Sequence, residues 1–204
     1  SLDEREQVSK ALQDAYGIEE KAITFETISS TVSNEMRTDA VIAVIVAAIC
    51  ILIYIWFRFK DIRFAGSAVI ALMHDVLVVF ACYAIMRISV GNTFIACMLT
   101  IVGYSINATI VIFDRIRENL ASMKNAAVED VVNTSITETL TRSIYTSFTT
   151  FVMVAVLYIL GVATIKEFSL PLMVGVIAGG YSSVCITGVL WYLMKRHSDK
   201  KTAK

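Results

Sequence analysis

His74 and Asp75 are the residues of this sequence whose types and position most clearly suggest chemistry. They lie near the middle of an apolar block, residues 64–86. An acid at membrane depth costs ~3 kcal/mol or more unless it is paired, protonated or hydrated, so it is a candidate for proton relay or transport. A structural hydrogen bond across a helix bundle is the alternative. Adjacent residues of a helix point about 100° apart, so we do not expect His74 and Asp75 to bond to each other.

Asn107 and Arg142 are two further polar residues at or near membrane depth. The amide of Asn107 can join helices through hydrogen bonds worth ~1 kcal/mol, or it can lie beside a hydrated proton path. Arg142 begins a segment rich in hydroxyl residues, where it either snorkels to the membrane surface or turns into the bundle. The residues alone do not separate these alternatives, so Asn107 remains a candidate for a proton path and Arg142 for a place inside the bundle.

A polar stripe runs along the block of residues 93–113 and past its end. At helical spacing one face carries Thr93, Cys97, Thr100, Tyr104, Asn107, Val111 and Asp114. Because lipid cannot satisfy the hydrogen bonds of such a face, we expect the stripe to look into a helix bundle.

The elements that must position these residues are membrane-spanning helices. The chain has 204 residues, of which 56% are hydrophobic, and a mean hydropathy of +0.68. Its apolar residues gather in five blocks, each near the ~20 residues that cross ~30 Å of hydrocarbon: 40–57, 64–86, 93–113, 143–165 and 170–194.

Composition and spacing argue against several classes of function. The formal net charge is zero, which gives no reason to expect a nucleic-acid partner. The four cysteines lie in apolar blocks without CxxC spacing, which favours reduced, buried thiols. Zinc-ligand spacing, glycine-rich phosphate loops and nucleophile–base pairs are absent from the sequence. We therefore expect a protein that is not an enzyme and holds no cofactor or metal.

The basic residues between the blocks are distributed unevenly. They gather after the first, third and fifth blocks: Arg58, Lys60, Arg63, Arg115, Arg117, Lys124, Lys195, Arg196, Lys200, Lys201 and Lys204. The opposite short loops hold only Arg87 and Lys166. Because cytoplasmic loops are rich in Lys and Arg, we expect a cytoplasmic C-terminus and an extracytoplasmic N-terminal segment.

Residues 1–36 are predicted to be the C-terminal part of an extracytoplasmic domain. An amphipathic helix ends at Gly17, and residues 22–28 alternate weakly as a short strand. One helix and one strand cannot bury a core, so we expect the rest of this domain to lie outside the chain. Residues 37–197 form the predicted five-helix bundle, and residues 198–204 form a basic cytoplasmic tail.

The longest connection between blocks, residues 114–142, is expected to be an amphipathic cytoplasmic loop. Residues 126–140 carry apolar side chains at roughly helical spacing, and Asn125 is available as the N-cap. This helix either rests on the membrane surface, which we favour, or contacts a partner.

Three glycines of the last block, Gly175, Gly179 and Gly180, give a helix surface without side chains. Such surfaces let membrane helices approach closely, so this face is predicted to pack against another helix.

Residues 103–119, GYSINATIVIFDRIREN, pass abruptly from an apolar half to a charged half. The stretch resembles the signature of the SecF family, the partner of SecD in the bacterial protein-export accessory complex. The match is carried by Gly103, Tyr104, Ser105, Asp114, Arg115, Arg117, Glu118 and Asn119. The chain departs from the family pattern at Ala108, where many members have an acid. The pair His74 and Asp75 and the residues around Arg142 also resemble the family, and this resemblance implies that Arg142 takes part in proton-driven function.

The resemblance implies an all-α membrane protein: a bundle of five transmembrane helices preceded by the end of a small α+β extracytoplasmic domain. It implies an accessory subunit of Sec export in the bacterial plasma membrane, within the resistance-nodulation-division superfamily. Such a subunit uses the proton-motive force to promote translocation of secreted proteins. The implied partners are a SecD-like subunit or repeat, the Sec translocon channel, secreted protein substrates and the lipid membrane.

Two alternatives come from other classes of function. A small-molecule or lipid exporter of the same superfamily would have large external loops, and the loops between these blocks are short. A structural assembly subunit without transport chemistry would use Asp75 and Arg142 only to hold helices together.

Overall fold

The computed structural model describes residues 2–17, 30–88 and 90–202. The chain divides into two compact units, Ser1–Arg37 and Thr38–Lys204, which are described separately. Within the described residues, every regular element is a helix.

In the first unit, α1 (Leu2–Tyr16) ends at Gly17, as predicted. Gly17 has a φ of +64°, and its N–H donates a hydrogen bond of 2.9 Å to the carbonyl oxygen of Gln13. Glycine adopts this left-handed conformation without steric cost, which is why it ends the helix here. The strand predicted for residues 22–28 lies outside the described residues.

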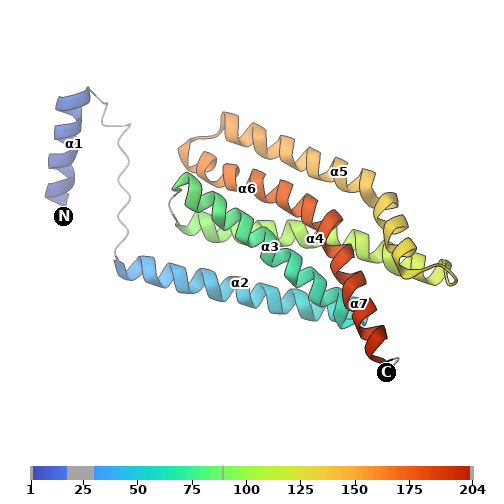
Figure 1. Ribbon diagram of the computed structural model, residues 1–204. Coiled ribbons are helices and arrows are strands. Elements are labelled where there is room, and N and C mark those ends of the chain that lie inside the picture. The colour runs from blue at the N-terminus through green and yellow to red at the C-terminus, as the bar shows by residue number, and fades with distance from the viewer. Residues whose placement is uncertain (1, 18–29, 89, 203–204) are drawn as a thin grey trace. The chain divides into compact units, whose positions relative to one another are not determined.

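From α2 onwards the chain is a succession of long helices (Figure 1). They are α2 (Ser30–Phe59), α3 (Ile62–Met86), α4 (Asn92–Ser122), α5 (Val128–Leu160), α6 (Ala163–Tyr181), the π-helix η2 (Ser182–Thr187) and α7 (Gly188–Thr202). Among the described residues, five stretches are long and apolar enough to cross a membrane: Val41–Phe59, Ile62–Met86, Thr93–Ser122, Val128–Leu160 and Thr164–Ser198. The prediction of five spans is confirmed, and the chain is a multi-pass membrane protein.

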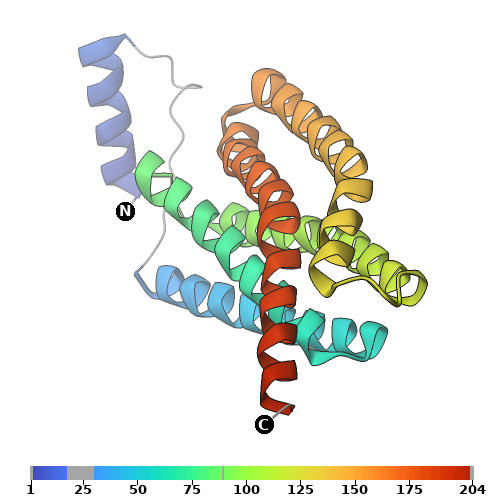
Figure 2. The ribbon, with the colours of Figure 1, turned by 45° about the vertical axis from the view of Figure 1, so that its right-hand side comes forward.

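Helix α6 is the element around which the other spans pack. It contacts α3, α4 and α5, and α3 also contacts α4. Figures 1 and 2 show these helices running side by side, with α6 continuing through η2 into α7.

Two apolar clusters fill the interior of the bundle at different levels. Near the turn between α2 and α3, the rings of Phe64 and Trp191 stack with centroids 4.8 Å apart. Toward the other end of α3, Tyr83 and Phe94 pack edge to face at 4.9 Å. The middle parts of α3 and α4 lie between these clusters, and they hold the buried polar residues Asp75 and Ser105.

The connection between α4 and α5 differs from its prediction. Helix α4 continues to Ser122 and α5 begins at Val128, so residues 114–122 and 128–142 extend the spans and do not form a loop. The predicted N-cap, Asn125, is wrong, because Ala127 holds the N-cap position without a side-chain hydrogen bond. Two acidic residues in the first turn of α5 complement the positive end of the helix dipole instead.

The turn between the last two spans also lies earlier than the apolar blocks suggest. Helix α5 ends at Leu160 and α6 begins at Ala163, so Lys166 belongs to a helix and not to a loop. Gly161 donates its N–H to the carbonyl oxygen of Leu157 at 2.8 Å, which closes the last turn of α5. Hydropathy misplaces this boundary because the residues on both sides of the turn are apolar.

Candidate functional site

Asp75 lies in the middle of α3, has no exposed surface, and is hydrogen-bonded through both carboxylate oxygens. Ser105 of α4 donates to Oδ2 at 2.5 Å, and Ser182 of η2 donates to the same oxygen at 2.7 Å. Nδ1 of His74 lies 3.0 Å from Oδ1. Short O–H···O contacts of about 2.5–2.7 Å are typical of hydroxyls that donate to an ionised carboxylate. One buried carboxylate therefore joins α3, α4 and η2.

The glycine face of α6 makes this meeting of helices possible. A Cβ atom built on Gly179 would lie 3.3 Å from Cβ of Ser105, tighter than most real contacts of this kind. The absence of a side chain at Gly179 thus lets α4 approach closely enough for Ser105 and Ser182 to share the same oxygen. A Cβ at Gly175 would collide with Ile101 of α4, and one at Gly180 would lie 2.8 Å from Oγ of Ser147 on α5.

The π-helix η2 begins at Ser182 itself. The carbonyl oxygen of Ser182 accepts a hydrogen bond of 3.0 Å from the Thr187 hydroxyl, five residues along the chain. Single π-helical turns are rare and frequently occur at functional sites. Ser182 therefore connects the carboxylate of α3 to an irregular turn in the last span.

The contact between His74 and Asp75 corrects an expectation from the sequence. Their Cα–Cβ bonds diverge around α3, but Nδ1 of the imidazole lies close to the backbone, so both side chains can turn toward a common flank. The side chain of His74 is 37% exposed, while that of Asp75 is 1% exposed. His74 consequently links the buried carboxylate to the outer surface of the bundle.

Ser182 is a site residue that the sequence does not single out, because it follows closely on the three glycines of the last block, where packing is expected. The available signal was the acid itself, since a buried carboxylate requires hydroxyl or amide donors from neighbouring spans. The sequence could not say which of several serines supplied them.

The polar stripe of α4 does not face the interior of this chain as a whole. Asn107 and Thr100 are exposed, while Ser105 and Thr109, which are outside the stripe, are buried. Helix α4 turns the face with Ser105 toward α3 and α6, and residues two positions apart on a helix lie nearly opposite each other. The prediction that the stripe looks into the bundle is therefore wrong for Asn107 within this chain.

Arg142 and Asn107 line one small cavity on this other side of α4. The cavity has a volume of about 50 Å³ and also contains Tyr104 and Ala108. A cavity of this size accommodates water where polar groups line it. Within the described residues, no hydrogen bond or ion pair joins Arg142 to Asp75, so the structure brings Arg142 and Asn107 together but keeps them apart from the buried carboxylate.

The charged half of residues 103–119 ties α4 to its neighbours. Asp114 pairs with Arg58 of α2 at 2.9 Å and lies 3.8 Å from Arg117. Arg115 pairs with Glu118 and with Glu138 of α5, each at 2.6 Å.

Asn119 continues this network from its buried position. Its Nδ2 donates to Glu138 at 2.8 Å and to Ser135 at 3.0 Å. A Cβ at Gly103, in contrast, would meet nothing within 4 Å. The charged end of the stretch therefore has a structural role, while Gly103 has no packing contact to explain it among the described residues.

These features define a class of protein: a multi-pass α-helical membrane protein with a hydrogen-bonded carboxylate buried between its spans. A sequence profile of the family described as "Protein export membrane protein SecD/SecF, C-terminal" matches residues 7–197. The chain belongs to the SecF family, as the resemblance of residues 103–119 predicted.

Relatives and solved structures agree with this membership. The protein translocase subunit SecF of Alicyclobacillus acidocaldarius is 43% identical over 89% of this chain and 60% of its own length. The SecDF of Bacillus subtilis is 39% identical over 95% of this chain and 26% of its own length. The crystal structure of SecDF from Thermus thermophilus, described as a translocon-associated membrane protein, matches 96% of this chain and 27% of that chain with a TM-score of 0.85 and 35% identity. This chain thus spans about three fifths of the SecF relative and about a quarter of each SecDF.

Proposed function

We propose that this chain is part of an accessory machine of Sec protein export, which uses the proton gradient to promote translocation of secreted proteins across the bacterial plasma membrane. Relatives named protein translocase subunit SecF and SecDF support this proposal. The chain would act without an enzymatic reaction of its own, together with a SecD-like subunit or repeat and the Sec translocon.

The observation that carries the proton-coupled part is the burial of Asp75 between apolar spans. Hydrogen bonds from Ser105, Ser182 and His74 lower the cost of keeping a carboxylate at this depth. A proton delivered by His74 binds Oδ1 and removes the negative charge of the carboxylate, so the hydrogen bonds that Ser105 and Ser182 donate to Oδ2 become weaker. The link between α3, α4 and η2 then loosens, which couples one proton to the packing of the last span.

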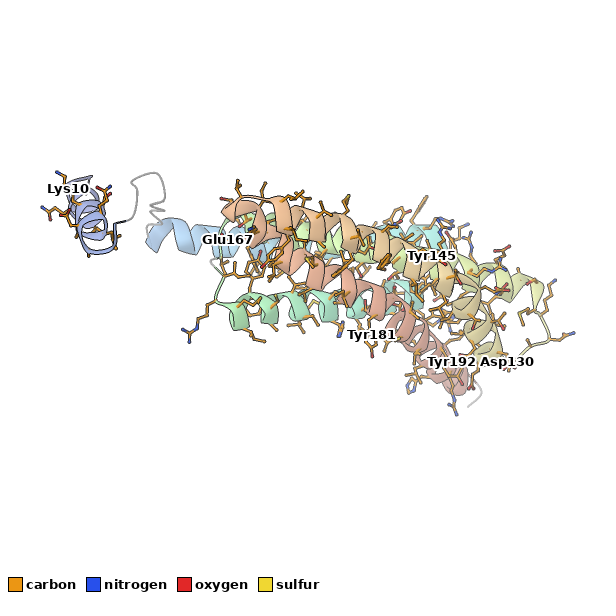
Figure 3. The ribbon with its side chains drawn as sticks, turned by 90° about the horizontal axis from the view of Figure 1, so that it is seen from above. Lys10, Asp130, Tyr145, Glu167, Tyr181 and Tyr192 are labelled. Carbon is orange, nitrogen blue, oxygen red and sulfur yellow. The ribbon has the colours of Figure 1, made fainter. Side chains whose placement is uncertain are left out.

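His74 supplies Asp75 with a route to the outside of the bundle. Imidazole can take up a proton on one ring nitrogen and release it from the other, which suits a relay. Its ring lies beside that of Tyr181, with centroids 6.3 Å apart, and Figure 3 shows Tyr181 at the outer side of the bundle. On this proposal protons reach Asp75 through His74.

Arg142 and Asn107 are proposed to take part in the same proton-driven function, on the face of the chain that a SecD-like partner covers. Both are exposed on this chain, although polar groups at membrane depth need hydrogen-bonding or charged partners. An acid of the partner would neutralise Arg142, and Asn107 would order water in the cavity between them. The uneven distribution of basic residues supports a cytoplasmic C-terminus and an extracytoplasmic N-terminal segment.

The test is the substitution Asp75→Asn in the complete SecD- and SecF-containing complex. We expect inverted membrane vesicles with this variant to lose the stimulation of preprotein translocation that a proton gradient provides, while ATP-driven translocation persists. Asp130→Asn is the matched control, because Asp130 lies in the exposed first turn of α5. Full stimulation with Asp75→Asn would refute the proposal. Loss of complex assembly would favour the structural alternative.

A further inference from the structure

A recess of about 660 Å³ lies where the turn between α2 and α3 meets α7. Trp56, Lys60 and Arg63 line it from the first two spans, and Met194 and His197 line it from the last. Its volume falls within the range of about 300–1,000 Å³ that is typical of ligand pockets. None of these residues belongs to the Asp75 site.

The position of the recess relative to the membrane follows from the residues at which the spans end. The first span ends at Phe59 and the second begins at Ile62, so Lys60 and Asp61 form the turn at the membrane surface. The last span ends at Ser198, which also lines the recess. The recess therefore opens at the level of the lipid headgroups.

The charges of the recess favour an anion. Asp61 caps α3 by accepting the backbone N–H of Arg63 at 2.9 Å, and it also accepts Nε of Arg63 at 3.0 Å. Among the described lining residues, Asp61 is the one acid and is already neutralised by Arg63, and Lys60 adds a positive charge. Lys195 lies nearby on α7, with its ammonium 5.1 Å from the ring of Trp191.

The flank of the recess is apolar. Trp56 is 55% exposed and Ile62 is 59% exposed, and both line the recess beside its charged residues. Further along α2, Ile53 and Ile49 are exposed at successive turns. A ligand with an anionic head and long apolar chains would match both the charge of the recess and the apolar surface of this flank.

We propose that the recess binds the headgroup of an anionic phospholipid, whose acyl chains lie along the exposed face of α2. Lys60 contacts the phosphate, and the Asp61–Arg63 pair holds the wall of the recess in shape. Basic pockets next to membrane spans bind acidic headgroups in this manner. The site is separate from the proposed proton path, because none of its residues contacts Asp75, His74 or Arg142.

The experiment measures binding of phosphatidylglycerol to the complete membrane protein by native mass spectrometry, with phosphatidylcholine as the neutral reference lipid. We expect Lys60→Gln to weaken phosphatidylglycerol binding about five-fold, since each basic residue near an acidic surface contributes about that factor. Lys60→Arg should retain binding. Lys124→Gln, which removes a lysine from the connection between α4 and α5, should leave binding unchanged.

Two results would overturn the assignment. Equal binding of phosphatidylglycerol by the wild type and Lys60→Gln would show that Lys60 does not contact the lipid. Displacement of phosphatidylglycerol by an equal concentration of glycerol phosphate would identify a site for a soluble phosphate, because a lipid held also by its chains resists such competition.

Discussion

Two adjacent serines of η2 have different relations to the buried carboxylate. Both are buried, but Ser182 donates to Asp75 and Ser183 donates to the carbonyl oxygen of Gly180. Removing a hydrogen bond to a charged group costs about 1.5–3 kcal/mol. We expect Ser182→Ala to destabilise the bundle by about this amount and to reduce gradient-driven export, as measured by thermal unfolding and vesicle translocation.

Ser183→Ala is the matched control, since it removes a hydroxyl of the same type from the same turn. Its export activity should stay close to that of the wild type. If both variants lose the same activity, the effect comes from packing of η2, and the link between Ser182 and Asp75 has no functional importance.

Ala108 is the position at which this chain departs from the family pattern, and it shares a cavity with Arg142. A carboxylate at this position would therefore meet a guanidinium across the cavity. We expect Ala108→Asp to be tolerated and to leave gradient-driven export near the wild-type level, because other acids carry the titratable role. The measurement is vesicle translocation with the purified complex.

A comparison of two variants can contradict the expectation that Ala108→Asp leaves export unchanged. If the complex with Ala108 were inactive, and Ala108→Asp created activity that persisted when Asp75→Asn was added, the titratable role of Asp75 would be wrong. Ala108 would then be the lesion that inactivates the chain.

At the scale of elements, the close approach of α4 and α6 depends on Gly179. A leucine there would push into Ser105, and overpacking of a core typically costs about 1–3 kcal/mol. We expect Gly179→Leu to lower the unfolding temperature of the bundle and to abolish gradient-driven export together. Gly103→Leu is the control, because its side chain would enter open space. Equal stability of the two variants would mean that Gly179 faces lipid.

Hydropathy and charge predicted the five spans, but not the elements that build the site. The π-helix η2 and the early start of α6 are set by contacts between helices, and no periodicity in the residues marks them. The two serine partners of Asp75 are 30 and 107 residues away in the chain, so local spacing could not identify them. The sequence did identify Asp75 as a candidate, because the free-energy cost of an acid at membrane depth is independent of the fold.

At the scale of the whole molecule, the chain spans only part of the length of its relatives. Its relatives named SecDF are about four times as long as the matching region. The polar face of α4 around Asn107 is exposed here, although a polar face in lipid requires a covering partner. Residue-level patterns predicted that this face is polar, but only the packing of α4 showed that Asn107 is exposed among the described residues.

A direct measurement can decide the orientation of the molecule in the membrane. The turn between α2 and α3, the connection between α4 and α5, and the end of α7 carry most of the basic residues, so we expect these parts in the cytoplasm. In a cysteine-free background, a membrane-impermeant thiol reagent added to the extracytoplasmic side should label Ser9→Cys and should not label Ser122→Cys. Both should react after detergent solubilisation, which controls for local accessibility. The reverse pattern in intact membranes would place Ser122 outside and would overturn the expected orientation.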